Sequence, residues 1–218
     1  MINYKPGDIF SFPIHSEEFG FGRILLDVYA QGIKPSKIDK QSPIYFTDNT
    51  ILVELYKNTH KDPEKLPNDL EPLVSGIFTS NGFIVSNDWN IIDFNVVQPT
   101  TIDFPEFVAQ KGAFSSIFIK GELKQEIELP FVKMNEIAIK PKSFPGIMFG
   151  PLMLYNLGRK EEIQLPNINA RSIDLAHLDV RFSPSREEIH SLLPIEFNNP
   201  YDELSKMKGF DIKRFYTS

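Results

Sequence analysis

Short runs of hydrophobic residues separated by polar breaks dominate the start of the chain, a pattern that predicts β-strands. Two aromatic-rich runs, at residues 9–14 and 19–29, flank the polar stretch HSEE. A break of about four residues between two such runs predicts an antiparallel hairpin. Gly20 and Gly22 lie inside the second run, and glycine within a strand marks a bulge or a close contact with another backbone.

The hydrophobic pattern predicts more strands through the first half of the chain. Residues 44–46 fit a strand, and residues 51–56 fit either a strand or a short helix. The polar, proline-rich residues 57–72 predict a surface loop. Asn81 and Gly82 lie between two apolar runs and predict a type I′ hairpin turn, because both residue types tolerate positive φ. Three further strands are expected, at residues 87–96, 114–119 and 123–129.

In the second half, strands remain the main prediction and helices appear only near the end. Residues 183–193 predict a short helix, with Pro184 in its first turn and Ser185 and Glu188 spaced as a capping box. A second short helix is expected at residues 200–209 and would end at its final glycine. Strand-like patterns cover residues 135–141, 146–158 and 172–182. The expected fold is therefore mainly β, with antiparallel twisted-sheet or small barrel-like units and two short C-terminal helices.

A weak internal similarity is compatible with two related units. A shift of 128 positions aligns Phe21 and Gly22 with Phe149 and Gly150 without a gap. The apolar residues that follow each pair also align. We therefore expect a β domain followed by a second, β-rich region with short helices. If the chain arose by duplication, the second region is a degenerate copy of the first. The two expected regions are residues 1–128 and 129–218.

Composition and charge narrow the function classes. The chain has 19 Phe against 7 Tyr and one Trp, and Phe favours strands. Its formal net charge of −6 argues against a nucleic-acid partner, which requires a basic surface. The complete absence of cysteine excludes disulfides, thiolate catalysis and cysteine-ligated metal sites.

Hydropathy indicates a cytoplasmic protein without a membrane partner. The first ten residues lack the charged-then-apolar pattern of a secretion signal. The longest apolar run, at residues 146–155, is well short of the roughly 20 residues that span a bilayer.

Few residues have the spacing of a catalytic site. His177, Asp179 and Arg181 would share one face of the strand expected at residues 172–182. A histidine beside a carboxylate can begin a general-base or metal site, so a hydrolase around His177 and Asp179 is one alternative. The same pattern is typical of a solvated strand face, which we favour. No HExxH, GxSxG or phosphate-binding glycine loop occurs, and we expect neither a metal nor a cofactor.

Several short motifs resemble those of a known bacterial family. Residues 7–10 read GDIF, residues 12–14 read FPI, and residues 20–25 read GFGRIL. Later landmarks are WNII at residues 89–92 and FPEF at residues 104–107. Over about residues 4–125 the chain resembles the immunity protein 26 family of polymorphic-toxin systems. It departs from the family pattern at Asp93, where members often have Gly, and in its long C-terminal extension.

The resemblance implies a cytoplasmic binding protein that neutralises a cognate toxin domain and has no chemistry of its own. It assigns no catalytic residues. A structural or adaptor β-protein without a toxin partner is the second alternative, beside the hydrolase.

An acidic binder would contact a basic toxin through its loop carboxylates, because opposite charges accelerate encounter. The expected partner-binding residues are Glu17, Glu18, Asp62, Glu64, Asp69, Glu71 and Asp88. Leu66 and Leu70, between the loop acids, are candidates for an apolar anchor. We expect Trp89 to be a buried core residue, and Arg23 to form a salt bridge with Asp8.

Overall fold

The computed structural model describes most of the 218-residue chain. The described residues are 4–15, 17–45, 49–86, 88–129, 139, 143–165 and 167–217. The strands expected at residues 44–46 and 135–141 lie partly outside this set. Ile44 is in a turn, and only Ile139 of the second segment is described.

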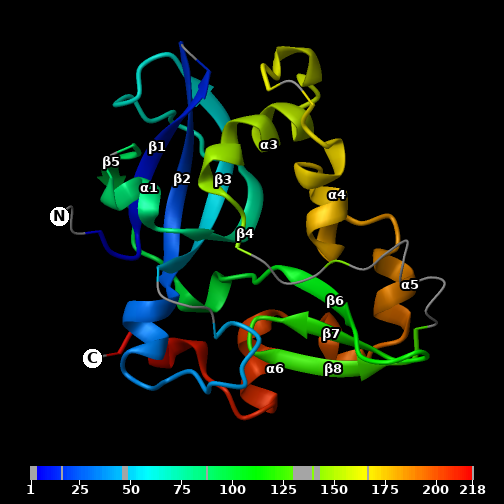
Figure 1. Cartoon of the computed structure of the whole chain (residues 1–218). Coiled ribbons are helices and arrows are strands. Elements are labelled where there is room, and N and C mark those ends of the chain that lie inside the picture. Colours follow the sequence, from blue (N-terminus) through cyan, green and yellow to red (C-terminus); the bar gives the residue numbers. More distant parts are fainter. Residues whose placement is uncertain are drawn as a thin grey trace.

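Five antiparallel strands form the larger sheet, in the order β4-β3-β2-β1-β5 (Figure 1). They are β1 (Asp8–His15), β2 (Glu18–Asp27), β3 (Thr50–His60), β4 (Pro72–Ser80) and β5 (Asn90–Phe94). The hairpin predicted from the opening residues is confirmed, with Phe12 paired with Gly20. Residues 51–56 form part of a strand and not of a helix. Because β3 continues through His60, the surface loop is shorter than residues 57–72.

The glycines of β2 allow close packing, as their position in a strand predicted. The pairing of β2 with β3 shifts register between Gly20 and Gly22. A Cβ atom on Gly22 would lie 2.6 Å from the ring of Phe10 and 2.7 Å from the carbonyl oxygen of Glu54. The predicted salt bridge between Arg23 and Asp8 is wrong. Arg23 lies opposite Glu54 across the sheet, and its Nε is 2.7 Å from the Glu54 carboxylate.

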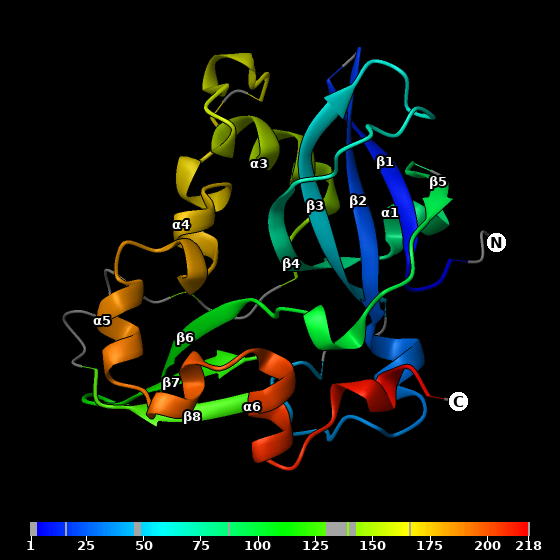
Figure 2. The same cartoon turned by 180° about the vertical axis from the view of Figure 1, so that it is seen from behind.

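Three antiparallel strands form the smaller sheet, in the order β6-β7-β8. They are β6 (Glu106–Gln110), β7 (Ser116–Lys120) and β8 (Leu123–Ile127). The pair predicted at residues 114–119 and 123–129 is confirmed, and Gly121 turns between the strands with φ +57°. The smaller sheet lies at the end of the molecule opposite the β1–β2 turn (Figures 1 and 2).

The described α-helices are short, and none is long and apolar enough to cross a membrane. They are α1 (Gly82–Val85), α3 (Phe149–Asn156), α4 (Leu175–Leu178), α5 (Arg186–Ser191) and α6 (Tyr201–Met207). The last two confirm the helices predicted near the C-terminus, and Gly209 follows α6 with φ +86°. The predicted capping box is not formed, because the Ser185 side chain makes no capping hydrogen bond.

The strand predicted at residues 146–158 is wrong, because this segment forms a 3₁₀ turn (Gly146–Met148) and then α3. The first six residues of α3, from Phe149 to Leu154, are all buried. A helix buried on every side has a continuous apolar sequence, which periodicity cannot distinguish from a buried strand. The weak repeat therefore aligns residues of β2 with residues of a helix.

Two other local predictions are also wrong. Residues 172–182 form α4 and a 3₁₀ turn (Val180–Phe182) because Asp174 and Asp179 accept hydrogen bonds from backbone N–H groups two residues ahead. Asn81 has a negative φ of −73° and precedes α1, so it makes no type I′ turn.

Helix and strand occupy similar shares of the described residues, 30% and 31%, so the fold is mixed and not mainly β. Both sheets are open, and the described strands form no closed barrel. The boundary expected between residues 1–128 and 129–218 stays a prediction.

Two hydrophobic clusters hold the layers together. In one, α3 packs on the larger sheet: Trp89 stacks between Phe10 and Phe149, with ring centroids 4.8 and 5.1 Å away. Trp89 is 2% exposed, which confirms its predicted burial. In the other, the smaller sheet packs on the C-terminal helices, as Phe118 does against Phe197 at 5.8 Å. Each cluster contains residues from both sides of the expected boundary.

Candidate functional site

Acidic side chains from three separate segments meet at one end of the larger sheet. The β1–β2 turn and the β3–β4 loop adjoin because Phe19 pairs with His60 (Figure 1). The 3₁₀ turn Lys160–Glu162 is held beside them by Arg159, which binds Glu18. We call this region the acidic end. Its carboxylates are Glu17, Glu18, Asp62, Glu64, Asp69, Glu71, Glu161 and Glu162, and its Lys and Arg residues are Lys57, Lys61, Lys65, Arg159 and Lys160.

Arg159 fixes the geometry of the acidic end. Its guanidinium donates to both carboxylate oxygens of Glu18, at 2.8 and 2.7 Å, and to Glu162 at 2.7 Å. Paired N–H donors match a carboxylate in both charge and shape. The Arg159 hydrogen bonds lower the pKa of Glu18 to about 2. Glu18 is therefore part of an internal ion pair that joins the hairpin to the C-terminal half.

The same region contains a possible metal-ligand set. Among the described residues, His15, Glu18 and Glu162 form the one group of three metal-ligating side chains with ligand atoms within 4.8 Å of one another. The Nε2 of His15 lies 2.8 Å from the Glu18 carboxylate. Arg159 already donates to both carboxylates, so a metal ion would have to displace a guanidinium that is well matched to them.

The structure brings six of the seven expected partner-binding residues to the acidic end and leaves one elsewhere. Glu17, Glu64 and Asp69 are exposed there, and Glu71 forms an exposed ion pair with Lys57. The remaining residue, Asp88, is exposed beside β5, and accepts a hydrogen bond from the Ser86 hydroxyl. Leu66 and Leu70 are half-buried in the β3–β4 loop.

The structure separates the two side chains of the predicted hydrolase site. His177 is exposed on α4, with its Nε2 4.0 Å from Asp174. Asp179 is buried and accepts hydrogen bonds from Arg181, at 2.6 Å, and from the backbone N–H of Glu106, at 3.1 Å. His177 and Asp179 therefore do not share the strand face on which the general-base hypothesis depended.

A largely buried network of charged side chains, which no sequence pattern predicted, joins the two sheets. Arg181 binds Asp179 and Asp103, the latter at 2.9 Å, and Asp103 also lies 3.1 Å from the Lys120 ammonium. Lys120 and His190 both contact Glu106, at 3.0 and 2.9 Å. We call this set the junction network. Its members are Ser75, Gly76, Asp103, Glu106, Lys120, Asp179, Arg181 and His190.

Electrostatics and space both indicate that the junction network is structural. Burial alone would raise the pKa of Glu106, but His190 and Lys120 lower it to about 2. Burial would likewise lower the pKa of Arg181, but Asp179 and Asp103 raise it. The cavity beside Asp179 measures about 20 Å³, far below the roughly 300–1,000 Å³ of a ligand pocket. A substrate has no room there.

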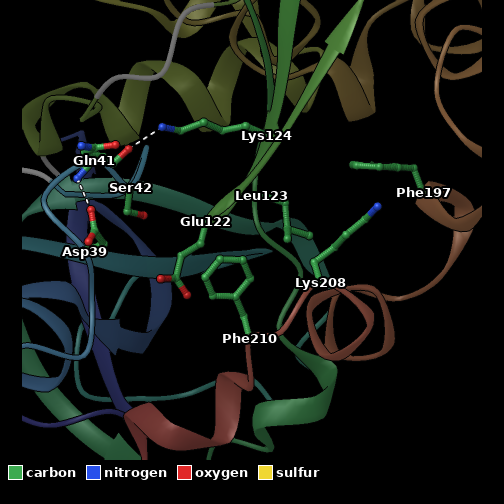
Figure 3. Close-up of a pocket in the computed structure, with 9 residues that line it drawn as sticks. All are labelled: Asp39, Gln41, Ser42, Glu122, Leu123, Lys124, Phe197, Lys208 and Phe210. Carbon is green, nitrogen blue, oxygen red and sulfur yellow. Dashed lines mark hydrogen bonds between the residues drawn. The ribbon is translucent and has the colours of Figure 1, made fainter.

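A larger pocket of about 340 Å³ opens where β8 begins (Figure 3). Its lining combines apolar rings with charged groups: Asp39, Gln41, Ser42, Glu122, Leu123, Lys124, Phe197, Lys208 and Phe210. The Lys124 ammonium donates to the carbonyl oxygen of Gln41, away from Phe197 and Lys208 (Figure 3). Glu122 is buried and pairs with Arg214, and burial raises its pKa.

The family of the chain follows from comparison with known proteins. The family model described as immunity protein 26 matches residues 5–119, which is more than half of the chain. The match includes both strands of the opening hairpin, all of the larger sheet, and β6 with most of β7. No curated protein and no solved structure matches the chain. On the strength of the family match, the chain belongs to the immunity protein 26 family.

Proposed function

We propose that this protein neutralises a cognate toxin domain by binding it stoichiometrically, in the cytoplasm and without chemistry of its own. Membership of the immunity protein 26 family carries the proposal. Two observations support a binding role. His177 and Asp179 do not form the predicted base–carboxylate pair, and the cavity beside Asp179 is too small for a substrate.

The proposed contact surface is the acidic end. Its exposed carboxylates, including Glu17, Glu64 and Asp69, lie on the β1–β2 turn and the β3–β4 loop. Such a rim would steer a basic toxin surface and increase the association rate. Leu66 and Leu70 would supply the apolar contact that affinity requires. Asp88, outside this region, remains a separately predicted contact.

The test is identification of what the protein binds in its native cells. The tagged full-length chain is purified at moderate salt, and stoichiometric partners are identified by mass spectrometry. We expect one partner that carries a toxin domain, a one-to-one complex by calorimetry, and loss of toxin activity in the complex. A neighbouring toxin that neither binds the chain nor loses activity with it would contradict the proposal.

A further inference from the structure

The free edge of the smaller sheet presents a strand with unused backbone hydrogen-bonding groups. Lys120 and Leu123 close the β7–β8 hairpin across a two-residue turn that begins at Gly121, with φ +57°. In such a turn the closing residues exchange hydrogen bonds, and the bonded pairs then alternate along the ladder. The N–H and C=O groups of Lys124 and Glu126 therefore point away from β7.

Nothing among the described residues covers this edge as a further strand. The sheet order is β6-β7-β8, with β8 outermost. Lys124 and Glu126 are both exposed. The Glu126 carbonyl oxygen accepts a 3.0 Å hydrogen bond from the adjacent Gln125 side chain, an interaction that a backbone donor can replace. Uncovered edges of this kind are templates for pairing with another chain.

We propose that the occupant of this edge is a second copy of the chain, paired antiparallel through β8 about a two-fold axis at Gln125. This register places Lys124 of one copy opposite Glu126 of the other, twice, and Leu123 opposite Ile127. Only residues with outward-facing backbone groups can exchange hydrogen bonds across the edge, and Lys124 and Glu126 are both of that kind. The strand is thus complementary to itself in hydrogen bonding and in charge, which a two-fold interface requires.

In the dimer, Lys124 and Glu126 can replace their present partners with each other's side chains across the interface. Lys124 donates to the backbone of Gln41, and Glu126 pairs with Lys111 between side chains that are both about half exposed. Exposed ion pairs of this kind contribute little to the stability of the fold. Oppositely charged residues directly across an antiparallel pair stabilise it, whereas like charges destabilise it.

Both ends of β8 offer further complementary surface. The 340 Å³ pocket adjoins Glu122, Leu123 and Lys124, and an open hollow adjoins the other end of the strand. The hollow is lined by Phe114, Ser115, Glu126, Ile127 and Glu128. The two-fold register sets the hollow of one copy beside the pocket of the other. Phe114, which is 81% exposed, would then lie near the partner's pocket and its apolar rings (Figure 3).

Sedimentation velocity over a range of concentrations of the full-length protein tests the pairing. We expect a monomer–dimer equilibrium that Lys124→Glu and Glu126→Lys each weaken at least about tenfold, because each creates like-charge pairs. The double variant K124E/E126K exchanges the charges and should restore the wild-type equilibrium. A monomer at every concentration, or a dimer that neither single variant weakens, would overturn the proposal.

A cysteine placed on the two-fold axis gives an independent test, because the chain contains no cysteine of its own. Opposed residues in a non-hydrogen-bonded antiparallel pair have Cα atoms about 4.5 Å apart, within the range that a disulfide spans. Gln125→Cys should therefore form a covalent dimer under mild oxidation. Lys61→Cys, exposed at the acidic end, is the matched control. Equal cross-linking of the two variants would contradict the register.

Discussion

The guanidinium of Arg181 donates a 2.7 Å hydrogen bond to the backbone carbonyl oxygen of Gly76. This contact ties the C-terminal part of the chain to β4 of the larger sheet. The same side chain binds Asp103 and Asp179, at 2.9 and 2.6 Å, and is only 7% exposed. Arg181 thus links the buried Asp179 and the partly exposed Asp103 to the larger sheet.

Replacement of Arg181 by Ala should destabilise the protein by about 3–5 kcal/mol, because it leaves a buried carboxylate without its counter-charge. Lysine should rescue only part of the loss, since one ammonium cannot bind Gly76, Asp103 and Asp179 together. Urea denaturation measures the change. Arg171→Ala, at an exposed position, is the control and should change stability by less than about 0.5 kcal/mol. Equal effects of the two alanine variants would contradict a structural role for the junction network.

Acid should destabilise the fold through Glu106. Burial opposes ionisation of this carboxyl group, but His190 and Lys120 lower its pKa from 4.5 to about 2. A depressed folded-state pKa contributes stability that is fully present above the unfolded-state pKa and is lost as the pH falls toward the folded-state value. The contribution is on the order of 3 kcal/mol and should disappear between about pH 5 and pH 2. Urea denaturation at a series of pH values measures it.

Glu106→Gln isolates this effect from that of Glu18, whose pKa is also about 2 and which therefore titrates over the same range. The variant should be less stable than wild type at neutral pH and should lose less stability on acidification. A variant with the wild-type slope below pH 5 would show that Glu106 is not responsible.

The sequence predicted those elements whose local hydrophobic and turn pattern is enough to determine their structure. The opening hairpin and the β7–β8 pair have polar breaks at their turns, and these positions were confirmed. The C-terminal helices were confirmed as well. The prediction failed for α3, where an apolar run that fits a buried strand forms a buried helix. Its place against β1 depends on tertiary contacts, such as the packing of Phe149 on Phe12 at 5.5 Å, which no local pattern reports.

Contacts between residues far apart in the sequence were likewise not predicted at the acidic end or in the junction network. The acidic end could be anticipated from loop carboxylates, although the role of Glu18 as the partner of Arg159 could not, because 141 positions separate them. The junction network was not predicted, although the sequence pattern had placed Asp179 and Arg181 together with His177. Arg181 and Gly76 are 105 positions apart, and Lys120 and Glu106 lie on neighbouring strands whose register the sequence did not give.

Trp89 should report the docking of α3 on the larger sheet. Its ring stacks on Phe149 of α3 and on Phe10 of β1, and it is the only Trp in the chain. Phe149→Ala should cost about 3–5 kcal/mol, through lost burial and the cavity that remains. The Trp89 emission should shift to longer wavelength in the folded variant, as water reaches the ring. Ile195→Ala, at an exposed position, is the control and should change neither stability nor emission.

The acidic end should control how fast the toxin binds. With the toxin domain identified by co-purification, the double variant E64K/D69K should lower the association rate at least about tenfold at low salt. The matched control is E187K/E203K, which makes the same change in net charge on exposed residues of α5 and α6. Because salt screens exposed charges over about 10 Å at 0.1 M, the difference between the two variants should shrink as salt is added. Surface plasmon resonance at several ionic strengths measures the association rate of each double variant. Equal association rates for the two variants would place the toxin contact elsewhere, and Asp88→Lys would then be the next variant to test.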